Sequence, residues 1–152
     1  MRDLHRIMLS SEVRDLTDEI GRLFEDLDRT APDRRQPSGH CTPALDVRET
    51  GEALEVVLDL PGVSADRIRV LLKAGVLLVV GEKCSPYAGG HPDASFHLVE
   101  RGFGRFARAV RLEGAFDGGR TTATVGGGEL RVLVPKIADR RGQEIHVPVA
   151  AA

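Results

Sequence analysis

The side chains that most often carry chemistry are sparse in this sequence and poorly spaced for it. Histidine occurs five times and cysteine twice among the 152 residues. Their positions are His5, His40, His91, His97, His146, Cys41 and Cys84. No two of them stand at the spacing of a zinc-ligand pair, and the cysteines form no CxxC motif. We therefore expect two reduced thiols, no metal and no other cofactor.

Nucleophile and nucleotide motifs do not appear in the sequence. It contains no GxSxG, no phosphate-binding P-loop and no dinucleotide-binding fingerprint. The acidic residues are scattered over polar strand faces and turns, where ordinary solvated charge explains them. The sequence therefore favours a protein that is not an enzyme.

A run of three glycines, Gly126 to Gly128, is the one stretch that could hold a phosphate group. That use requires a helix to start directly behind the glycines. Instead, Leu130, Val132 and Val134 alternate with other residues, which is the period of a strand with one buried face. We predict a tight β-hairpin here, whose second strand ends at Pro135 because proline cannot donate to a ladder.

The same alternation recurs along most of the chain after residue 44, with turn signals between the runs. The expected strands lie near residues 45–47, 54–60, 68–72, 76–81, 96–99, 105–112, 121–125 and 130–134. Short strands at this spacing, without long helices between them, indicate an all-β fold built as an antiparallel β-sandwich.

The first thirty residues have a different period. The apolar residues follow one face of a helix, at Leu16, Ile20, Leu23, Phe24 and Leu27. Two interpretations are open for this stripe: the helix docks on its own domain, or it presents an apolar surface for self-association or for other proteins. The segment 30–43 contains Pro32, Pro37 and Pro43 and no periodicity, which is typical of a linker and favours a tethered helix.

These changes of pattern divide the chain into three parts. Residues 1–42 form the helix and linker, residues 43–136 the sandwich, and residues 137–152 a flexible C-terminal tail. Hydrophobic residues make up 41% of the chain but aromatic residues only 4%, so the core must consist of Val, Leu, Ile and Ala.

Charge and hydropathy exclude several classes of partner. The net charge is −2, so no basic surface indicates nucleic acid. No run approaches the ~18 apolar residues of a membrane span, and the N-terminus lacks the features of a signal peptide. We expect no stable membrane insertion and a cytoplasmic location.

Three ordered sets of residues resemble the small heat-shock proteins of bacterial type, whose shared unit is the α-crystallin domain. The first set is Pro43-x-x-Asp46-Val47-x-Glu49, followed by Leu54-x-Val56 and Asp59-Leu60-Pro61-Gly62-Val63. The second is Leu77-x-Val79-x-Gly81-Glu82-Lys83 with Glu100-Arg101-x-x-Gly104-x-Phe106-x-Arg108, and the third is Ala123-x-x-x-x-Gly128-x-Leu130 with Ile145-x-Val147. The resemblance covers residues 43 to 149. Glu113 and Glu129 depart from the family's usual proline and valine, both at strand ends.

The resemblance implies an immunoglobulin-like sandwich that dimerises and then assembles into larger oligomers. In bacterial relatives, a strand in the long loop crosses to the partner's sheet, and here that strand corresponds to residues 96–99. The implied dimer-interface residues are Phe96, Leu98, Glu100 and Arg108, with Arg108 as the central arginine and Glu100 as its acidic partner.

The resemblance also assigns a role to the C-terminal tail. The tail motif, Ile145 and Val147 with Val149 as an alternative register, docks in the family into a groove on a neighbouring dimer. The matching groove residues are Ile68, Val70, Leu72 and Val125. The N-terminal stripe defined above corresponds to the client-binding helix.

The function implied by the resemblance is an ATP-independent holdase chaperone. Such a protein binds partly unfolded proteins, limits their aggregation under stress and leaves refolding to ATP-driven chaperones. The alternative is a non-chaperone scaffold or co-chaperone module similar to the CS-domain proteins, which lack the tail motif and the loop strand.

Overall fold

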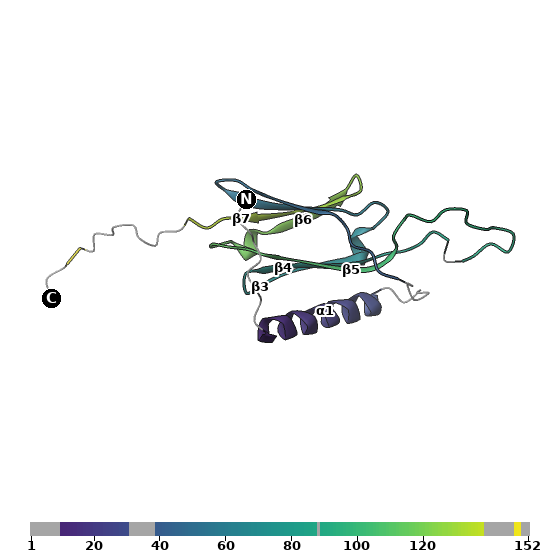
Figure 1. Cartoon of the computed structure of the whole chain (residues 1–152). Coiled ribbons are helices and arrows are strands. Elements are labelled where there is room, and N and C mark those ends of the chain that lie inside the picture. The colour runs from purple at the N-terminus through teal and green to yellow at the C-terminus, as the bar shows by residue number, and fades with distance from the viewer. Residues whose placement is uncertain (1–9, 31–38, 88, 139–147, 150–152) are drawn as a thin grey trace.

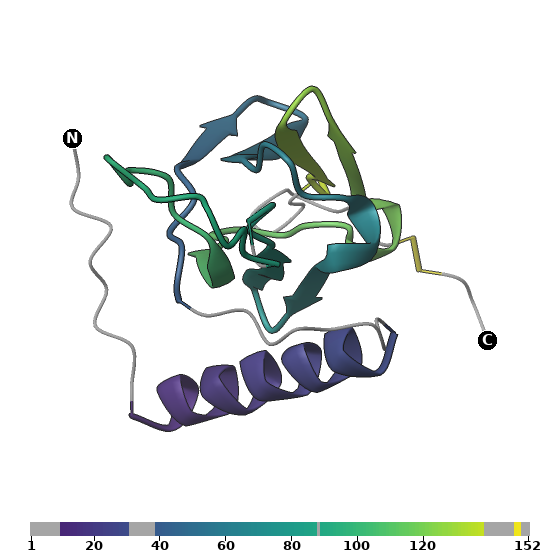
Figure 2. The same ribbon diagram turned by 90° about the vertical axis from the view of Figure 1, so that its right-hand side faces the viewer.

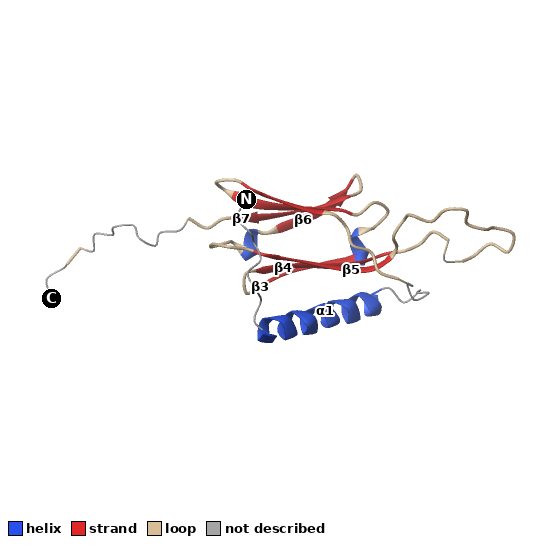
Figure 3. Ribbon diagram, in the orientation of Figure 1, coloured by secondary structure: helices blue, strands red, loops and turns tan. Residues whose placement is uncertain are grey.

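The chain forms two β-sheets stacked face to face, with one helix lying against the outer face of one sheet (Figures 1 and 3). This computed structural model describes residues 10–30, 39–87, 89–138 and 148–149. Its elements are α1 Ser10–Thr30, β1 Leu45–Glu49, β2 Ala53–Asp59, η1 Ala65–Arg67, β3 Ile68–Lys73, β4 Val76–Lys83, β5 Gly104–Arg111, η2 Gly118–Arg120, β6 Thr122–Gly126 and β7 Glu129–Pro135.

The first sheet has four antiparallel strands in the order β1-β2-β7-β6. Its central pair is β2 and β7, in which Val56 lies opposite Val132. In both strands every second side chain is buried, because successive side chains of a strand point to opposite faces. One face of this sheet therefore forms half of the sandwich core.

The second sheet has three antiparallel strands in the order β3-β4-β5. Leu77 and Val79 of β4 belong to the sandwich core, which also includes Phe106 of β5. Their neighbours Leu78 and Val80 belong to a second, separate apolar cluster on the opposite face. The strand β4 is thus buried on both faces, as its uninterrupted apolar run requires.

Glycines at two places allow a tight turn and a close approach between two backbone segments. Gly127 and Gly128 join β6 to β7 with φ of 59° and 83°, the left-handed conformation of a two-residue hairpin turn. Gly104 has φ of 117°, and a Cβ there would collide with the backbone of Gly39. Beside this contact, His40 pairs with Arg105 as a parallel bridge along the start of β5.

The fold predicted from the sequence is confirmed in its main features. The glycine run forms a hairpin and is followed by a strand, not by a helix that could bind phosphate. The strands lie within residues 45–135, and α1 is the one long helix among the described residues. An antiparallel β-sandwich with an N-terminal helix is therefore the architecture of this chain.

Candidate functional site: a helix-covered sheet face, a projecting loop and two sheet edges

The apolar face of α1 packs against the outer face of the β3-β4-β5 sheet (Figures 1 and 2). All five residues of the expected stripe contribute, and they pack with Leu71, Leu78 and Val80 of the strands. Leu27 is fully buried, whereas Leu16, Ile20, Leu23 and Phe24 remain partly exposed. Full burial of one leucine stabilises a contact by about 1.5–3 kcal/mol, so Leu27 is the main anchor of the helix.

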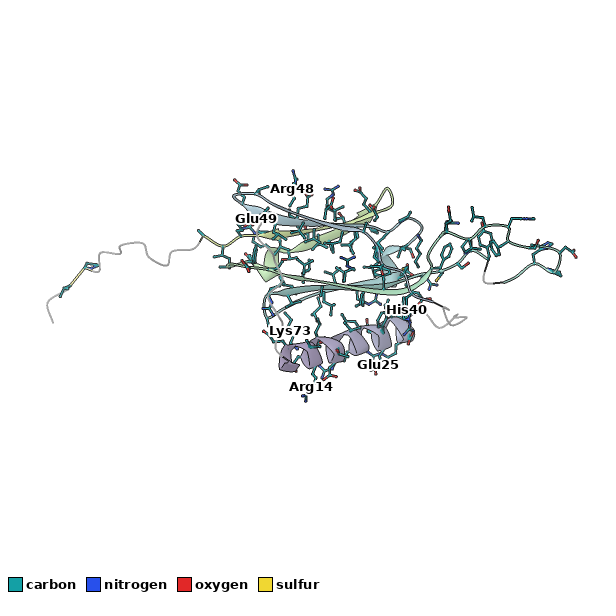
Figure 4. The ribbon with its side chains drawn as sticks, viewed as in Figure 1. Arg14, Glu25, His40, Arg48, Glu49 and Lys73 are labelled. Carbon is teal, nitrogen blue, oxygen red and sulfur yellow. The ribbon has the colours of Figure 1, made fainter. Side chains whose placement is uncertain are left out.

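Ion pairs surround this apolar contact. Arg69 Nε lies 2.7 Å from Asp26 Oδ2, Arg105 Nη2 lies 2.6 Å from Asp28 Oδ1, and Arg111 Nη2 lies 3.1 Å from Glu12 Oε1. Lys73 pairs with Glu19, and Figure 4 shows Lys73 at the edge of the sheet that carries the helix. Arg14 and Glu25 lie on the opposite side of the helix (Figure 4).

Two of these pairs shift the titration of the helix carboxylates. A hydrogen bond from Lys73 lowers the pKa of Glu19, and a hydrogen bond from Arg69 lowers the pKa of Asp26. The side chain of Asp26 is 41% exposed and that of Glu19 is 18% exposed, so solvent weakens the attraction more at Asp26 than at Glu19.

The prediction of a tethered helix is therefore wrong for this structure. The linker composition was a poor guide because a proline-rich connection restricts only its own backbone, not the position of the element that it connects. The continuous apolar run of β4 was the signal that the outer face of the sheet also needed a cover. Sequence reasoning missed the sheet-side partners of α1, namely Leu71, Leu78, Val80, Arg69, Lys73, Arg105 and Arg111.

A long loop between β4 and β5 projects from one end of the sandwich (Figure 1). Phe96 is 66% exposed and Leu98 is 73% exposed, and the ring of Phe96 meets that of Tyr87 edge-on at 5.3 Å. Residues 96–99, expected as a strand, form no strand within the single chain. A strand forms only with a ladder partner, and among the described residues no strand pairs with this segment, so its apolar side chains stay in solvent.

Arg108 and Glu100 do not meet within one chain. Arg108 is half-buried on the same side of β5 as Phe106, and its Nη1 donates to the carbonyl of Pro43 at 2.8 Å. Glu100 is exposed in the projecting loop and forms no ion pair among the described residues. Their pairing across a dimer interface stays a prediction.

The expected groove residues lie at the outer edges of the two sheets, on β3 and β6. Ile68 is buried in the sandwich core, which leaves it little surface for a ligand. Val70, Leu72 and Val125 are half-buried and pack on the core from both edges. Of the tail motif, Ile145 and Val147 lie outside the described residues, and Val149 is 96% exposed.

The one buried charged side chain among the described residues is Glu82 of β4. Its Oε1 lies 3.7 Å from Arg67 Nη1 and accepts a hydrogen bond from the thiol of Cys84 at 3.3 Å. This contact ties η1 to the end of β4 and is structural. The described residues contain no cluster of His, Cys, Asp and Glu that could hold a metal ion, and none of their helices is long and apolar enough to cross a membrane.

A two-sheet sandwich of this topology, with a long loop before the edge strand β5, is typical of the α-crystallin class of β-protein. The model of the Hsp20/alpha crystallin family matches residues 46–150. The chain belongs to this family. Membership in this family supports a chaperone role.

Individual relatives agree with this assignment. The chain is 35% identical over 119 residues to a 21.9 kDa heat shock protein of Oryza sativa subsp. japonica, covering 74% of this chain and 58% of the rice protein. It is 29% identical over 119 residues to heat shock protein 16 of Schizosaccharomyces pombe, covering 78% and 83% of the two chains. The chain therefore spans little more than half of the rice relative.

Solved structures share the fold. Heat shock protein 16.0 from Schizosaccharomyces pombe superposes with a TM-score of 0.62 at 25% identity, covering 73% of this chain and all of that one. A small heat-shock protein from Xylella fastidiosa, described as having a distinct high order structure, gives 0.61 at 28% identity and covers 72% and 98%.

Proposed function

We propose that this protein is an ATP-independent holdase that binds partly unfolded proteins and limits their aggregation under heat or other stress. It leaves refolding to ATP-driven chaperones and acts in the cytoplasm. The observation that carries the proposal is the helix α1, whose apolar face rests on the sheet with only Leu27 fully buried. A contact of this size can open while the sandwich core stays closed, which uncovers apolar surface for a client.

Self-assembly is the second part of the proposal. The exposed Phe96 and Leu98 lie on a loop long enough to reach another subunit, and an unpaired strand gains backbone partners at a sheet edge. We propose that residues 96–99 pair with the partner subunit in a dimer. The tail then links dimers by docking between the sheet edges that carry Val70, Leu72 and Val125. It docks through Ile145 with Val147, or through Val147 with Val149.

The experiment that tests the holdase function follows client aggregation by light scattering. An unrelated enzyme is heated alone, with this protein, or with an inert protein of equal mass, always without nucleotide. We expect this protein to suppress scattering near an equimolar subunit ratio, because uncovered apolar surface competes with client self-association. Scattering equal to that of the inert protein would contradict the holdase function.

A further inference from the structure

The interface between α1 and the sheet separates charge by sign. In the described residues, all four ion pairs across it place the acid on the helix and the base on β3 or β5. Three of the acids, Glu12, Glu19 and Asp26, stand seven residues apart and therefore follow one edge of the helix. The sheet face is thus an apolar strip with cations along both borders.

The register of the strands places these cations in two tiers. Lys73 and Arg111 both pair with Val76 and so lie at the same end of the sheet. Arg69 and Arg105 lie toward the other end, and the Arg105 guanidinium also stacks 4.9 Å from the ring centroid of Phe24. An amphipathic helix with acidic borders and an aromatic residue near its C-terminal end therefore matches this face along its whole length.

The fit of α1 to this face is incomplete. A cavity of about 290 Å³ opens between the N-terminal half of the helix and the sheet, lined by Leu16, Leu71, Val76 and Leu78 among others. Gly21 lies in the middle of the helix, where glycine weakens helical structure. A loosely packed helix can be displaced by another helix with the same pattern.

We infer that the outer face of the β3-β4-β5 sheet is a binding surface for acidic amphipathic helices, and that α1 is its resident ligand. The occupant that replaces α1 is an acidic amphipathic segment of a client protein. This inference rests on the proposed holdase function, since it names the client chemistry that one surface selects. Charge complementarity excludes basic amphipathic segments from the same surface.

The test uses full-length protein and labelled peptides, read by fluorescence anisotropy. One peptide has the sequence of residues 10–30, a second is an unrelated acidic amphipathic helix of equal length, and a third is its twin with lysine at each acidic position. Leu27→Asp should undock α1, because it places a charge where Leu27 is buried against the sheet. Ile20→Asp, at a half-buried position, serves if the first variant does not fold. We expect both acidic peptides to bind the undocked variant about tenfold tighter than the wild type, because α1 no longer competes.

Charge reversal on the sheet makes the test specific. Arg69→Glu with Lys73→Glu, added to the undocked variant, should abolish binding of the acidic peptides and permit binding of the lysine twin. Arg48→Glu with Arg131→Glu is the matched control, because these cations pair with Glu55 on the other sheet and touch no helix residue. This control should leave every affinity unchanged.

Several outcomes would overturn the inference. Equal binding of acidic and basic peptides would show that the outer sheet face does not select acidic helices. No effect of Arg69→Glu with Lys73→Glu would show that the peptides bind elsewhere. If only the peptide of residues 10–30 binds, the surface recognises α1 of a second copy of this protein, and the inference that it binds client segments is wrong. The aggregation assay on the same samples separates this inference from the proposed function: suppression without peptide binding refutes only the inference, whereas peptide binding without suppression refutes the holdase role.

Discussion

Single residues in this molecule differ sharply in how much change they tolerate, and two glycines show the contrast. A Cβ at Gly81 would collide with the ring of Phe106 and lie 2.7 Å from the carbonyl oxygen of Arg67. At Gly21, in α1, a Cβ would meet nothing within 4 Å. We expect Gly81→Ala to destabilise the protein by about 1–3 kcal/mol and Gly21→Ala to stabilise α1 by about 0.5–1 kcal/mol.

Urea unfolding followed by circular dichroism checks both changes, each variant serving as the control of the other. Gly81→Ala should lower the midpoint of the sheet transition. An unchanged midpoint would mean that Phe106 moves aside without cost and that the core around β4 is less tightly packed than its burial indicates.

Among the described residues, the Arg108 side chain donates a hydrogen bond to the Pro43 carbonyl, and we propose a further contact across the dimer. Arg108→Ala removes the hydrogen bond to the Pro43 carbonyl and should cost about 1.5–3 kcal/mol even in a monomer. Glu100→Gln is the cleaner probe, because Glu100 is exposed in the single chain. We expect it to leave monomer stability unchanged and to raise the dissociation constant of the dimer.

Sedimentation over a dilution series measures that constant. If Glu100→Gln and the wild type dissociate at the same concentration, Glu100 is not the interface partner of Arg108.

At the scale of elements, the docking of α1 should depend on pH in a predictable direction. Glu19 faces Lys73 and Arg22, and Asp26 faces Arg69 and Arg29. The pKa of each carboxyl is lowered in the folded state, by hydrogen bonds from Lys73 and Arg69 respectively. The stabilisation is therefore complete above the unfolded pKa of about 4 and is lost as pH falls through the lower folded value.

Hydrogen exchange, corrected for the intrinsic effect of pH on the exchange rate, measures this release. Below about pH 4, we expect faster exchange in α1, while amides of β2 and β7 stay protected. Glu19→Gln with Asp26→Asn should show the loosened helix already at pH 7. Parallel loss of protection in α1 and in the sandwich would mean that the two unfold as one unit.

The elements themselves could be predicted because their signals are local. The alternation of Val132 and Val134 and the glycines before them define a hairpin within a few residues of sequence. The stripe from Leu16 to Leu27 alone could not predict the placement of α1, since it is the same for a docked and a free helix; the apolar run of β4 was the one indication of docking. The complementary cations are distant in sequence and do not form a local pattern.

At the scale of the whole molecule, assembly should depend on the tail. Two buried aliphatic side chains contribute about 3–6 kcal/mol before the cost of ordering the segment, so each link is weak alone and strong in number. Replacing Ile145, Val147 and Val149 with alanine should reduce large oligomers to dimers without changing the circular dichroism spectrum of the sandwich.

Light scattering with mass determination checks this prediction. Ile137→Ala is the matched control, because this exposed residue lies before the tail motif and its backbone N–H is held by Ala115. If the triple variant still forms full-size oligomers, the tail does not mediate assembly, and the N-terminal helix becomes the candidate for this role.

The position of α1 ahead of its own docking face has a consequence for biosynthesis. A ribosome completes the helix at Thr30 but finishes the covering sheet only at Arg111. Because synthesis proceeds at about 5–20 residues per second, the apolar stripe of α1 lacks its docking face for roughly 4–16 s. An isolated helix of this length is marginal in water. Every nascent chain therefore exposes the apolar stripe of α1 during its synthesis, and other chaperones can bind this stripe before the sheet is complete.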